Sequence, residues 1–419
     1  MEDGYRVDGE IGRFHFTTHR VTDTNGVKFN TATNLFCRLK GKEWYRTVGF
    51  KEIAIILGDV VHSYRTTAQL INRVRYQPID GTPYRTLQAN TESEGARLID
   101  YLESKTNHIL KRHRFSDDGT YKGNPAVFGS GEPDILPEQQ IEAAAERMGG
   151  DYSLSDLLGN PVCFEDPAKS VSIAIDDVGV KRQSETRQKV AADSDKPQKR
   201  KSVYSTVVRI DHDRKRYSLV GAGIKISLRY LVAFLLSNQL SGKRFQFFTD
   251  GHTILNDTIR RCFKWYPNYG IILDWFHLVK KCKEQLSLAS KGRLIRNEIL
   301  TELMPLLWHG LTTQGIERLK QIEPTKIKNA ESLAKLIAYL ERNNEMIPCY
   351  ALRKRLGLRN SSAIGEKMND LIVSSRQKHN GMSWSKNGSL ALATLTAAKI
   401  NREDQSWLRE KKLSFKLAA

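Results

Sequence analysis

The stretch that decides the fold is Phe245–Lys281, FQFFTDGHTILNDTIRRCFKWYPNYGIILDWFHLVKK. A short apolar run ends on Asp250-Gly251, an amphipathic helical pattern follows, and a second apolar run at 271–273 ends on Asp274. This succession predicts a strand, a helix and a second strand of a buried parallel sheet. Ligand-handling groups lie beyond the carboxyl ends of such strands, so the two aspartates indicate a metal or phosphate site. Each also has an ordinary alternative, because Asp-Gly is a common turn and Asp a common helix N-cap.

A third acidic strand end lies upstream, in SVSIAID at 170–176. The alternation places Asp176 on the face of Ser172 and Ala174, which leaves room for a ligand. Asp177 would point to the isoleucine side, so Asp176 is the favoured acid and Asp177 the alternative. Segments 201–210 and 217–220 are typical of a hairpin, and 228–236 is typical of a helix.

The predicted order is three strands, a helix, a strand ending in Asp250, a helix, and a strand ending in Asp274. This is the order of a ribonuclease H-like mixed α/β sheet, in which the first and fourth strands are neighbours. Segment 283–359 has helical periodicity, which predicts an all-α insertion between Asp250 and the later part of the sheet domain. An α-rich, helix-turn-helix-like region is expected to precede this fold.

Composition favours a polyanionic partner. Lys and Arg total 66 against 47 acids, a net charge of +19, and the 40% apolar and 27% charged residues describe a soluble globular protein. The five cysteines are scattered, which argues against a disulfide framework and a zinc finger. No apolar run of membrane-spanning length and no signal sequence is present, so we expect a cytoplasmic, nucleoid-associated protein without a membrane partner.

Two short helical patterns, FKEIAIILG and SYRTTAQLINRVRY, are joined by a tight turn within 47–113, with Ser63 as the expected N-cap of the second. This arrangement predicts a helix-turn-helix, although an ordinary helical hairpin fits the pattern too. The side chains expected to face DNA are Arg65, Thr67, Gln69, Asn72 and Arg73. Residues 1–46, including Leu35–Leu39, are expected to form short strands, and 77–90 a loop.

Four segments carry a resemblance to a known family: IDDVGVKRQ at 175–183, FTDG at 248–251, LDWFH at 273–277, and AIGEKMNDLIVSSRQKHNGMSW at 363–384. Over residues 170 to 400 the chain resembles bacterial insertion-sequence transposases of the DDE class, in the Mutator-like branch with a D-x-x-H motif. The resemblance implies that Asp176, Asp250 and Glu366 form a metal-binding catalytic triad, with Asp370 as the alternative third acid. Asp274 and His277 would be the D-x-x-H pair.

The chemistry of the acids agrees with that implication. Phosphoryl transfer requires charge neutralisation at the attacking and leaving oxygens, which two divalent ions supply. Three carboxylates suit Mg²⁺ or Mn²⁺. His277 would orient the site or contact DNA, or else bind metal directly.

Several other features have two interpretations each. Arg376 and Lys378 fit a DNA phosphate path or a plain basic face, and Trp384 fits base stacking or packing. The polar segment 181–201 fits a phosphate-contacting arm or a solvated connection.

The sequence therefore predicts a transposase that binds element ends and performs metal-dependent cleavage and strand transfer. The alternatives are a ribonuclease H-like nuclease without strand transfer and an inactive, domesticated DNA-binding protein. Expected partners are double-stranded DNA, at element ends and target, and further copies of the chain in a synaptic complex. The predicted domains are a strand segment (1–46), a DNA-binding region (47–113), a hinge (114–168), a catalytic domain (169–282 and 360–400), a helical insertion (283–359) and a tail (401–419).

Overall fold

The computed structural model describes residues 2–30, 44–78, 81–128, 134–148, 164–183, 202–361, 363–378 and 381–418. Contacts within the chain define two compact units: residues 1–102, 179–203 and 371–414 form the first, and residues 103–178, 204–370 and 415–419 the second. The strand predicted at 35–39 and most of the segment 181–201 lie outside the described residues. The domain boundaries inferred from the sequence stay predictions.

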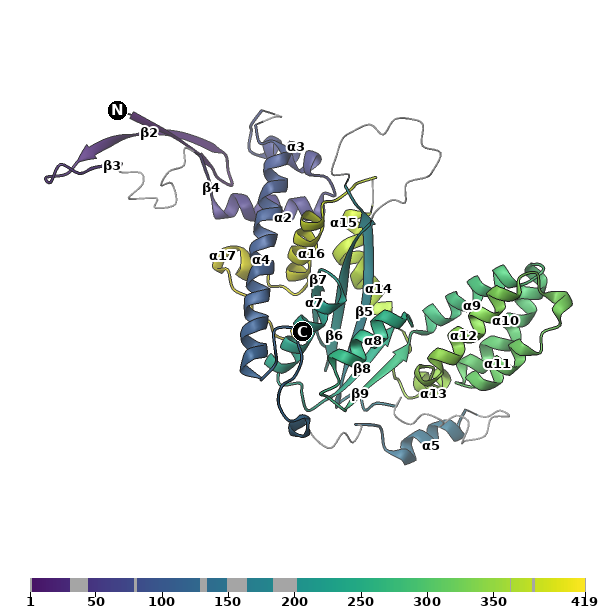
Figure 1. Ribbon diagram of the computed structural model, residues 1–419. Helices are drawn as coiled ribbons and strands as arrows, with labels where there is room; N and C mark the ends of the chain where they lie inside the picture. Colours follow the sequence, from purple (N-terminus) through teal and green to yellow (C-terminus); the bar gives the residue numbers. More distant parts are fainter. Residues whose placement is uncertain are drawn as a thin grey trace. The chain divides into compact units, whose positions relative to one another are not determined.

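The second unit is built on a five-stranded mixed sheet of order β7-β6-β5-β8-β9 (Figure 1). β6 and β7 are antiparallel, as the predicted hairpin requires, whereas β5 pairs in parallel with β8 and β8 with β9. The class is therefore mixed α/β, and the first and fourth strands of this sheet are neighbours, as the sequence predicted. The strands are β5 (Ser170–Lys181), β6 (Ser202–His212), β7 (Lys215–Gly221), β8 (Arg244–Thr249) and β9 (Tyr269–Leu273).

Burial explains why the short apolar runs became central strands. All six residues of β8 are buried, which is typical of a strand covered on both faces. In β5, Val171, Ile173 and Ile175 are buried, whereas Asp176 is half-buried and Asp177 is exposed. The parallel register pairs Ala174 with Phe248, so Asp176 and Asp250 each lie two residues beyond the last paired positions. The sheet thus places these two acids at the same edge.

Helices surround this sheet in the second unit. α7 packs against β7 and α8, and α9 packs against α10 and α12. The helices are α5 (Glu138–Glu146), α7 (Ile224–Ser237), α8 (Thr253–Cys262), α9 (Trp275–Ala289), α10 (Arg293–Trp308), α11 (Thr312–Lys320), α12 (Ala330–Asn343), α13 (Tyr350–Arg355) and α14 (Ala363–Asn369). Short 3₁₀ turns lie at Pro125–Phe128, Pro324–Lys326 and Asn344–Met346.

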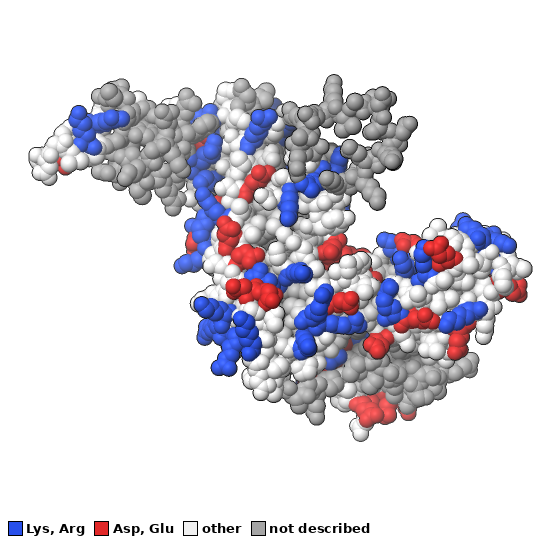
Figure 2. Space-filling model, viewed as in Figure 1, with Lys and Arg blue, Asp and Glu red and all other residues white. Residues whose placement is uncertain are grey.

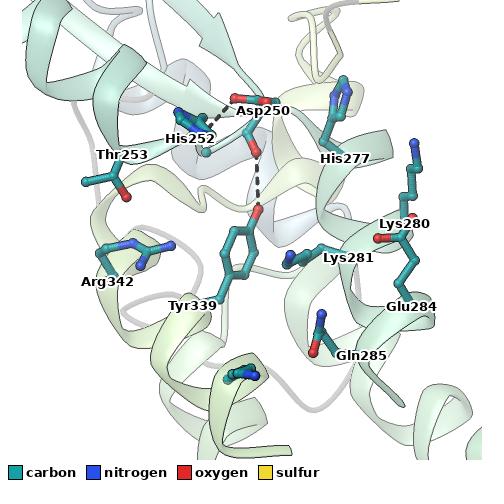
Figure 3. A pocket seen from close by; sticks show the side chains of 12 residues that line it. Asp250, His252, Thr253, His277, Lys280, Lys281, Glu284, Gln285, Tyr339 and Arg342 are labelled. Atoms are coloured by element: carbon teal, nitrogen blue, oxygen red, sulfur yellow. Dashed lines mark hydrogen bonds between the residues drawn. The ribbon is translucent and has the colours of Figure 1, made fainter. Parts of the chain in front are cut away.

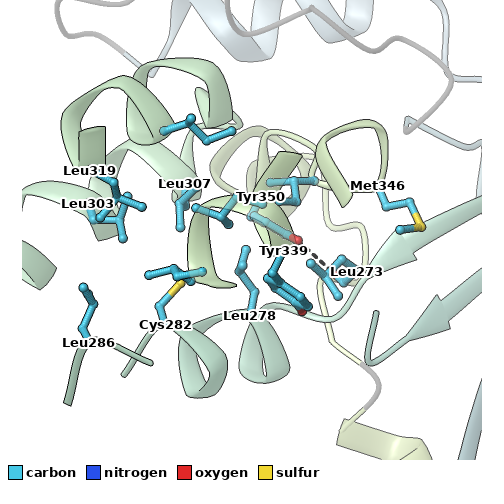
Figure 4. Close-up of a cluster of buried hydrophobic side chains, with 14 of the residues drawn as sticks. Leu273, Leu278, Cys282, Leu286, Leu303, Leu307, Leu319, Tyr339, Met346 and Tyr350 are labelled. Atoms are coloured by element: carbon cyan, nitrogen blue, oxygen red, sulfur yellow. Dashed lines mark hydrogen bonds between the residues drawn. The ribbon is translucent and has the colours of Figure 1, made fainter. Parts of the chain in front are cut away.

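The helices α9 to α12 share one apolar core with the end of the sheet (Figure 4). Leu278, Cys282 and Leu286 of α9 pack in the same cluster as Leu303 and Leu307 of α10. Tyr350 closes the cluster at the sheet, where its hydroxyl donates to Leu273 O at 2.7 Å. This shared core fixes α9, and with it the side chains that α9 carries, against the end of β9.

The helix that carries Glu366 is less regular than its sequence suggests. α14 ends at Asn369 and continues as a π-helical turn over Asp370–Ser374, followed by the short α15 (Ser375–Gln377). A π-turn adds a residue to the turn and shifts the positions that follow. In this turn Leu371 is 41% exposed, whereas Ile372 and Val373 are fully buried.

The first unit contains a four-stranded sheet of order β3-β2-β1-β4, with β1 (Glu2–Asp8), β2 (Arg13–Thr22), β3 (Lys28–Asn30) and β4 (Trp44–Arg46). Its helices are α2 (Val48–Val60), α3 (Tyr64–Val74), α16 (Lys386–Ile400) and α17 (Asp404–Glu410), with α15 and most of α4 (Tyr84–Arg112). None of the helices described combines the length and apolarity needed to span a membrane.

Two local predictions for this unit have different outcomes. Ser63 caps α3 as predicted, because its hydroxyl accepts a hydrogen bond from Thr66 N at 3.3 Å. The loop predicted over 77–90 is wrong from Tyr84 onward, where α4 begins. Leu87 is completely buried in a cluster with Phe50 and Ala54, so packing extends the helix into a segment rich in turn-forming residues.

Candidate active site

Two carboxylates lie just beyond the paired part of the central parallel strands of the second unit. Asp250 directly follows β8, whereas Asp176 lies within β5, two residues past its last pairing with β8. The strand expected to end at Asp176 instead continues to Lys181. They are close enough that the Asp250 charge raises the pKa of Asp176, in addition to the larger effect of burial, to about 6. A bound cation would stabilise two neighbouring carboxylates of like charge, one of which is mostly removed from solvent.

The turn after β8 holds Asp250 in a defined orientation. Its Oδ1 accepts a hydrogen bond from His252 N at 2.8 Å, and its backbone oxygen accepts one from the Tyr339 hydroxyl at 3.4 Å (Figure 3). Gly251 has a φ of +79°, and a Cβ there would come within 2.8 Å of Leu273 Cδ1 and 2.9 Å of the Tyr339 hydroxyl. Only glycine fits this position without strain or a clash, which explains the Asp-Gly pair.

The second acid of the opening stretch, Asp274, has a different role. It is 1% exposed and caps α9, accepting a hydrogen bond from His277 N at 2.9 Å. Its Oδ1 also lies 3.3 Å from His277 Nδ1. The ordinary N-cap interpretation therefore describes Asp274, and through this cap the aspartate also positions the imidazole.

His277 links Asp274 to Glu366. Its Nε2 lies 3.4 Å from Glu366 Oε1, while its Nδ1 faces Asp274. The interaction of its ring N–H with the Asp274 carboxylate is the main cause that raises the pKa of His277, and the charges of Asp274, Glu366 and Asp250 add to it against the opposing effect of burial. A raised pKa means that a larger fraction of His277 is protonated near neutral pH. In the protonated ring both nitrogens are hydrogen-bond donors.

The surroundings of the acids differ between the alternatives that the sequence left open, Asp176 or Asp177 and Glu366 or Asp370. Asn369 Nδ2 donates to Asp176 Oδ2, whereas the Thr206 hydroxyl donates to Asp177 Oδ1. Asp176 therefore faces the helix that carries Glu366, and Asp177 faces β6. Asp370 is exposed and lies in the π-turn. The geometry groups Asp176, Asp250 and Glu366 around His277.

The carboxylate oxygens of Asp176, Asp250 and Glu366 are of the type that binds a divalent cation. In the conformation described, however, these side chains do not surround one common position. Within the described residues, no three His, Cys, Asp or Glu side chains converge on a possible metal position. Carboxylate oxygens are nevertheless the ligands that Mg²⁺ prefers. The buried Asn369 Oδ1 beside Asp176 also lacks a hydrogen-bond partner among the described residues, which leaves a further oxygen for a cation or its water. Side-chain rotation would be needed to bring these oxygens together.

The predicted DNA-contacting residues of α3 divide into two groups. Arg65, Gln69 and Arg73 are exposed, as DNA contact requires. Thr67 and Asn72 are completely buried: the Thr67 hydroxyl donates to Ser63 O at 2.8 Å, and Asn72 Oδ1 accepts from Thr82 N at 2.9 Å. Their prediction as DNA contacts is wrong in this structure, because both side chains stabilise the local fold instead.

Arg376 is also a structural residue in this structure. It is 1% exposed and donates to Gly58 O at 2.8 Å and to His62 O at 3.1 Å, which are backbone oxygens at the end of α2. The guanidinium also lies 5.3 Å from the centre of the Trp384 ring, and Trp384 Nε1 donates to Gln377 O. The prediction that Arg376 contacts DNA therefore does not fit its burial, and Trp384 packs. Lys378 is exposed.

Some residues of this region were not predicted from the sequence. Asn369 lies three positions after Glu366, a spacing that places both on one helical face, but nothing in the sequence points to its contact with Asp176. Tyr339 and Arg342 of α12, which line a pocket beside Asp250, are distant in sequence from every strand-end acid. Their pattern gives no signal beyond an amphipathic helix.

Residues 251–412 match a family model described as "Uncharacterised protein family (UPF0236)". That range contains His277 and Glu366, whereas Asp176 and Asp250 precede it. No curated protein sequence matches the chain. Among solved structures, the chain is similar to the Drosophila P element transposase strand transfer complex, with 10% sequence identity and a TM-score of 0.27. The match covers 92% of this chain and 86% of that one.

Proposed function

We propose that this chain is a DNA transposase with a ribonuclease H-like catalytic domain, which cleaves and joins DNA strands with divalent metal ions. The observation that carries the proposal is the closeness of Asp176 and Asp250, each two residues beyond the last paired positions of neighbouring parallel strands, with His277 linking Glu366 to the same place. The sheet order with an antiparallel hairpin on one side and parallel strands on the other supports this fold. The net charge of +19 supports DNA as the substrate.

Each residue has a definable role in such a reaction. Asp176, Asp250 and Glu366 would hold Mg²⁺ or Mn²⁺, which when bound neutralise charge on the attacking and leaving oxygens. The turn at Gly251 fixes Asp250, and Asn369 fixes Asp176. His277 positions Glu366 through its contact with the buried Asp274. In the reaction a water or a DNA 3′ hydroxyl attacks phosphorus in line, and the bond from phosphorus to the 3′ oxygen of the strand breaks.

A cleavage assay tests the proposal. The full chain is incubated with a plasmid that carries the DNA flanking its gene on both sides, together with a second plasmid as target, in Mg²⁺, Mn²⁺ or EDTA. We expect strand breaks at defined positions and joined products only when divalent ions are present. Asp250→Asn protein purified in the same way is the control for contaminating nucleases.

The outcomes separate the alternatives. Cleavage without joined products would indicate a ribonuclease H-like nuclease. Specific DNA binding with neither cleavage nor joining, in both Mg²⁺ and Mn²⁺, would indicate an inactive DNA-binding protein. Breaks at random positions in the Asp250→Asn sample would indicate a contaminating nuclease, whereas breaks at the same defined positions as with the unmodified chain would refute the assignment of Asp250.

A further inference from the structure

A pocket of about 430 Å³ opens beside Asp250 in the second unit, between the start of α8 and the helices α9 and α12 (Figure 3). We infer that this pocket holds the phosphodiester backbone of a DNA strand, next to the phosphate that reacts at Asp176 and Asp250. The inference rests on the proposed function and adds to it the surface that binds the substrate strand, with Lys281 and Arg342 as the residues that contact its phosphates.

Two helical faces form the walls of this pocket. On α9 the lining positions recur at spacings of three and four residues, so they share one face. On α12 the lining positions follow the same spacing, and the two helices pack against each other. The lining side chains are His277, Lys280, Lys281, Glu284 and Gln285 from α9 and Lys335, Tyr339 and Arg342 from α12.

The charge of the walls is mainly positive. Four Lys or Arg side chains line the pocket, against the two acids Asp250 and Glu284. Lys335 already forms an ion pair with Glu331 at 2.7 Å, whereas Lys280, Lys281 and Arg342 form no ion pair with any described residue. These three cations are therefore available to an anionic ligand.

Tyr339 holds the two central cations in place. The Lys281 ammonium lies 5.9 Å and the Arg342 guanidinium 5.8 Å from the centre of its ring, both within cation–π range. The Tyr339 hydroxyl donates to the backbone oxygen of Asp250. One buried side chain thus connects the cationic walls to the strand-end acid.

The lining of the pocket extends along both helices, which favours a strand over a single small anion. The α12 wall runs from Lys335 to Arg342, seven residues or roughly 10 Å along a helix. Phosphates of one DNA strand rise by about 3.4 Å along the duplex axis and lie further apart along the backbone itself, so the wall is long enough for more than one phosphate. The cations that line the pocket would also offset the repulsion that Asp176 and Asp250 exert on a nearby phosphate. Charges this close to one another, within about one Debye length, are only partly screened by salt.

Cationic side chains also lie outside the pocket, among acidic ones. On the face seen in Figure 2, Lys and Arg side chains alternate with Asp and Glu over the surface of the molecule and do not form one unbroken patch. A residue-specific test is therefore possible, because neutralising exposed cations outside the pocket changes net charge without changing the pocket.

The test measures binding of the full chain to fluorescently labelled single-stranded and duplex DNA in EDTA, where cleavage cannot proceed. The test variant is Lys281→Gln/Arg342→Gln, which keeps much of the side-chain stem over Tyr339. The matched control, Lys283→Gln/Arg293→Gln, removes the same charge from exposed positions that do not line the pocket. Thermal melting of both variants checks that they fold.

We expect the test variant to bind DNA at least about 10-fold more weakly, and its slope of log K against log salt to fall by about 2, since each phosphate contact contributes about 0.9. The control should stay within about 3-fold of the unmodified chain. An equal loss in both double variants, or no DNA binding by the folded unmodified chain, would overturn the inference. So would tight calorimetric binding of pyrophosphate that only the test variant loses, which would show a small-anion site.

The DNA-binding test distinguishes failure of the pocket inference from failure of the proposed transposase activity. If the unmodified chain binds DNA through Lys281 and Arg342 but never cleaves it, the proposed transposase activity fails and the strand-binding pocket stands. If the chain cleaves DNA and the test variant behaves like its control in binding and cleavage, the pocket inference fails and the proposed activity stands.

Discussion

The Asp176 carboxyl combines burial with a neighbouring carboxylate, and both raise its pKa to about 6 from an ordinary value of 3.8. A raised pKa means that the folded state prefers the protonated form. The protonated Asp176 carboxyl therefore stabilises the folded state in full below pH 3.8. This stabilisation is lost as the pH rises through about 6. The difference between 3.8 and about 6 corresponds to at most about 3 kcal/mol, so the ionised form of Asp176 destabilises the fold near neutral pH.

The first prediction follows from this pKa. In EDTA, Asp176→Asn should be more stable than the unmodified chain by about 1–3 kcal/mol at pH 7.5, and the difference should shrink towards zero below pH 4. Urea unfolding at both pH values measures it. Asp177→Asn is the control, because the exposed Asp177 has a hydrogen bond from Thr206 and should show no such gain. A gain that is the same at both pH values would mean that charge is not its origin.

The second prediction concerns the three acids together. Asp176→Asn, Asp250→Asn and Glu366→Gln each keep the side-chain size and remove a charge that would hold a metal ion. Each should lose DNA cleavage by about 1,000-fold or more, which corresponds to several kcal/mol of transition-state stabilisation. Asp177→Asn and Asp370→Asn should be milder. Full cleavage by Glu366→Gln, together with loss in Asp370→Asn, would move the third acid one turn further along the helix.

At the scale of elements, the short helix α15 is fixed to the end of α2 by one arginine. Arg376 donates to two backbone oxygens there and stacks near the rings of Tyr64 and Trp384. A helix end leaves its last backbone oxygens without intrahelical partners, and a buried end requires other donors. The guanidinium supplies these donors from a segment that is more than 300 residues distant in the chain.

The third prediction tests this role. Arg376→Lys loses the planar donor geometry and should destabilise the chain by about 2–4 kcal/mol, measured by urea unfolding. The neighbouring Lys378→Gln is exposed and should change stability by less than about 0.5 kcal/mol. If instead Arg376→Lys leaves stability intact and weakens DNA binding, Arg376 contacts DNA as its sequence context suggested.

The fourth prediction concerns α3. Among the residues expected to contact DNA, only those with exposed side chains can do so without unfolding the helix. Arg65→Gln/Arg73→Gln should weaken duplex binding and reduce its salt dependence by about 1–2 in slope, with unchanged thermal stability. Asn72→Ala should instead lower stability by about 1–3 kcal/mol, because it leaves the buried Thr82 backbone N–H without its partner. Unchanged DNA binding in the arginine variant would favour an ordinary helical hairpin.

At the scale of the whole molecule, a metal ion that binds only the folded chain must stabilise it. The fifth prediction is that 10 mM Mg²⁺ raises the free energy of unfolding of the unmodified chain by about 1–2 kcal/mol, for a dissociation constant of the order of 1 mM. Melting of the Asp176→Asn and Asp250→Asn variants should not respond to Mg²⁺ beyond the response to an equal ionic strength of NaCl. An equal response in all three proteins would refute a metal site at these acids.

The sequence by itself determined the strands and most helices, and their order in the five-stranded sheet. The runs SVSIAID, FQFFT and IIL became β5, β8 and β9, and Ser63 caps α3, because hydrophobic periodicity and capping depend on residues close together in the chain. The adjacency of β5 and β8 also followed from this order, and with it the expectation that Asp176 and Asp250 meet at one edge.

Only the tertiary structure decided which polar side chains are buried and what surrounds the strand-end acids. Thr67, Asn72 and Arg376 have the residue types of DNA contacts, yet distant or neighbouring backbone groups use their hydrogen bonds. α4 begins early because Leu87 packs in a core. The pocket between α9 and α12 has no local signal either. Burial and pocket shape depend on contacts between segments far apart in the chain, which periodicity within one segment cannot specify.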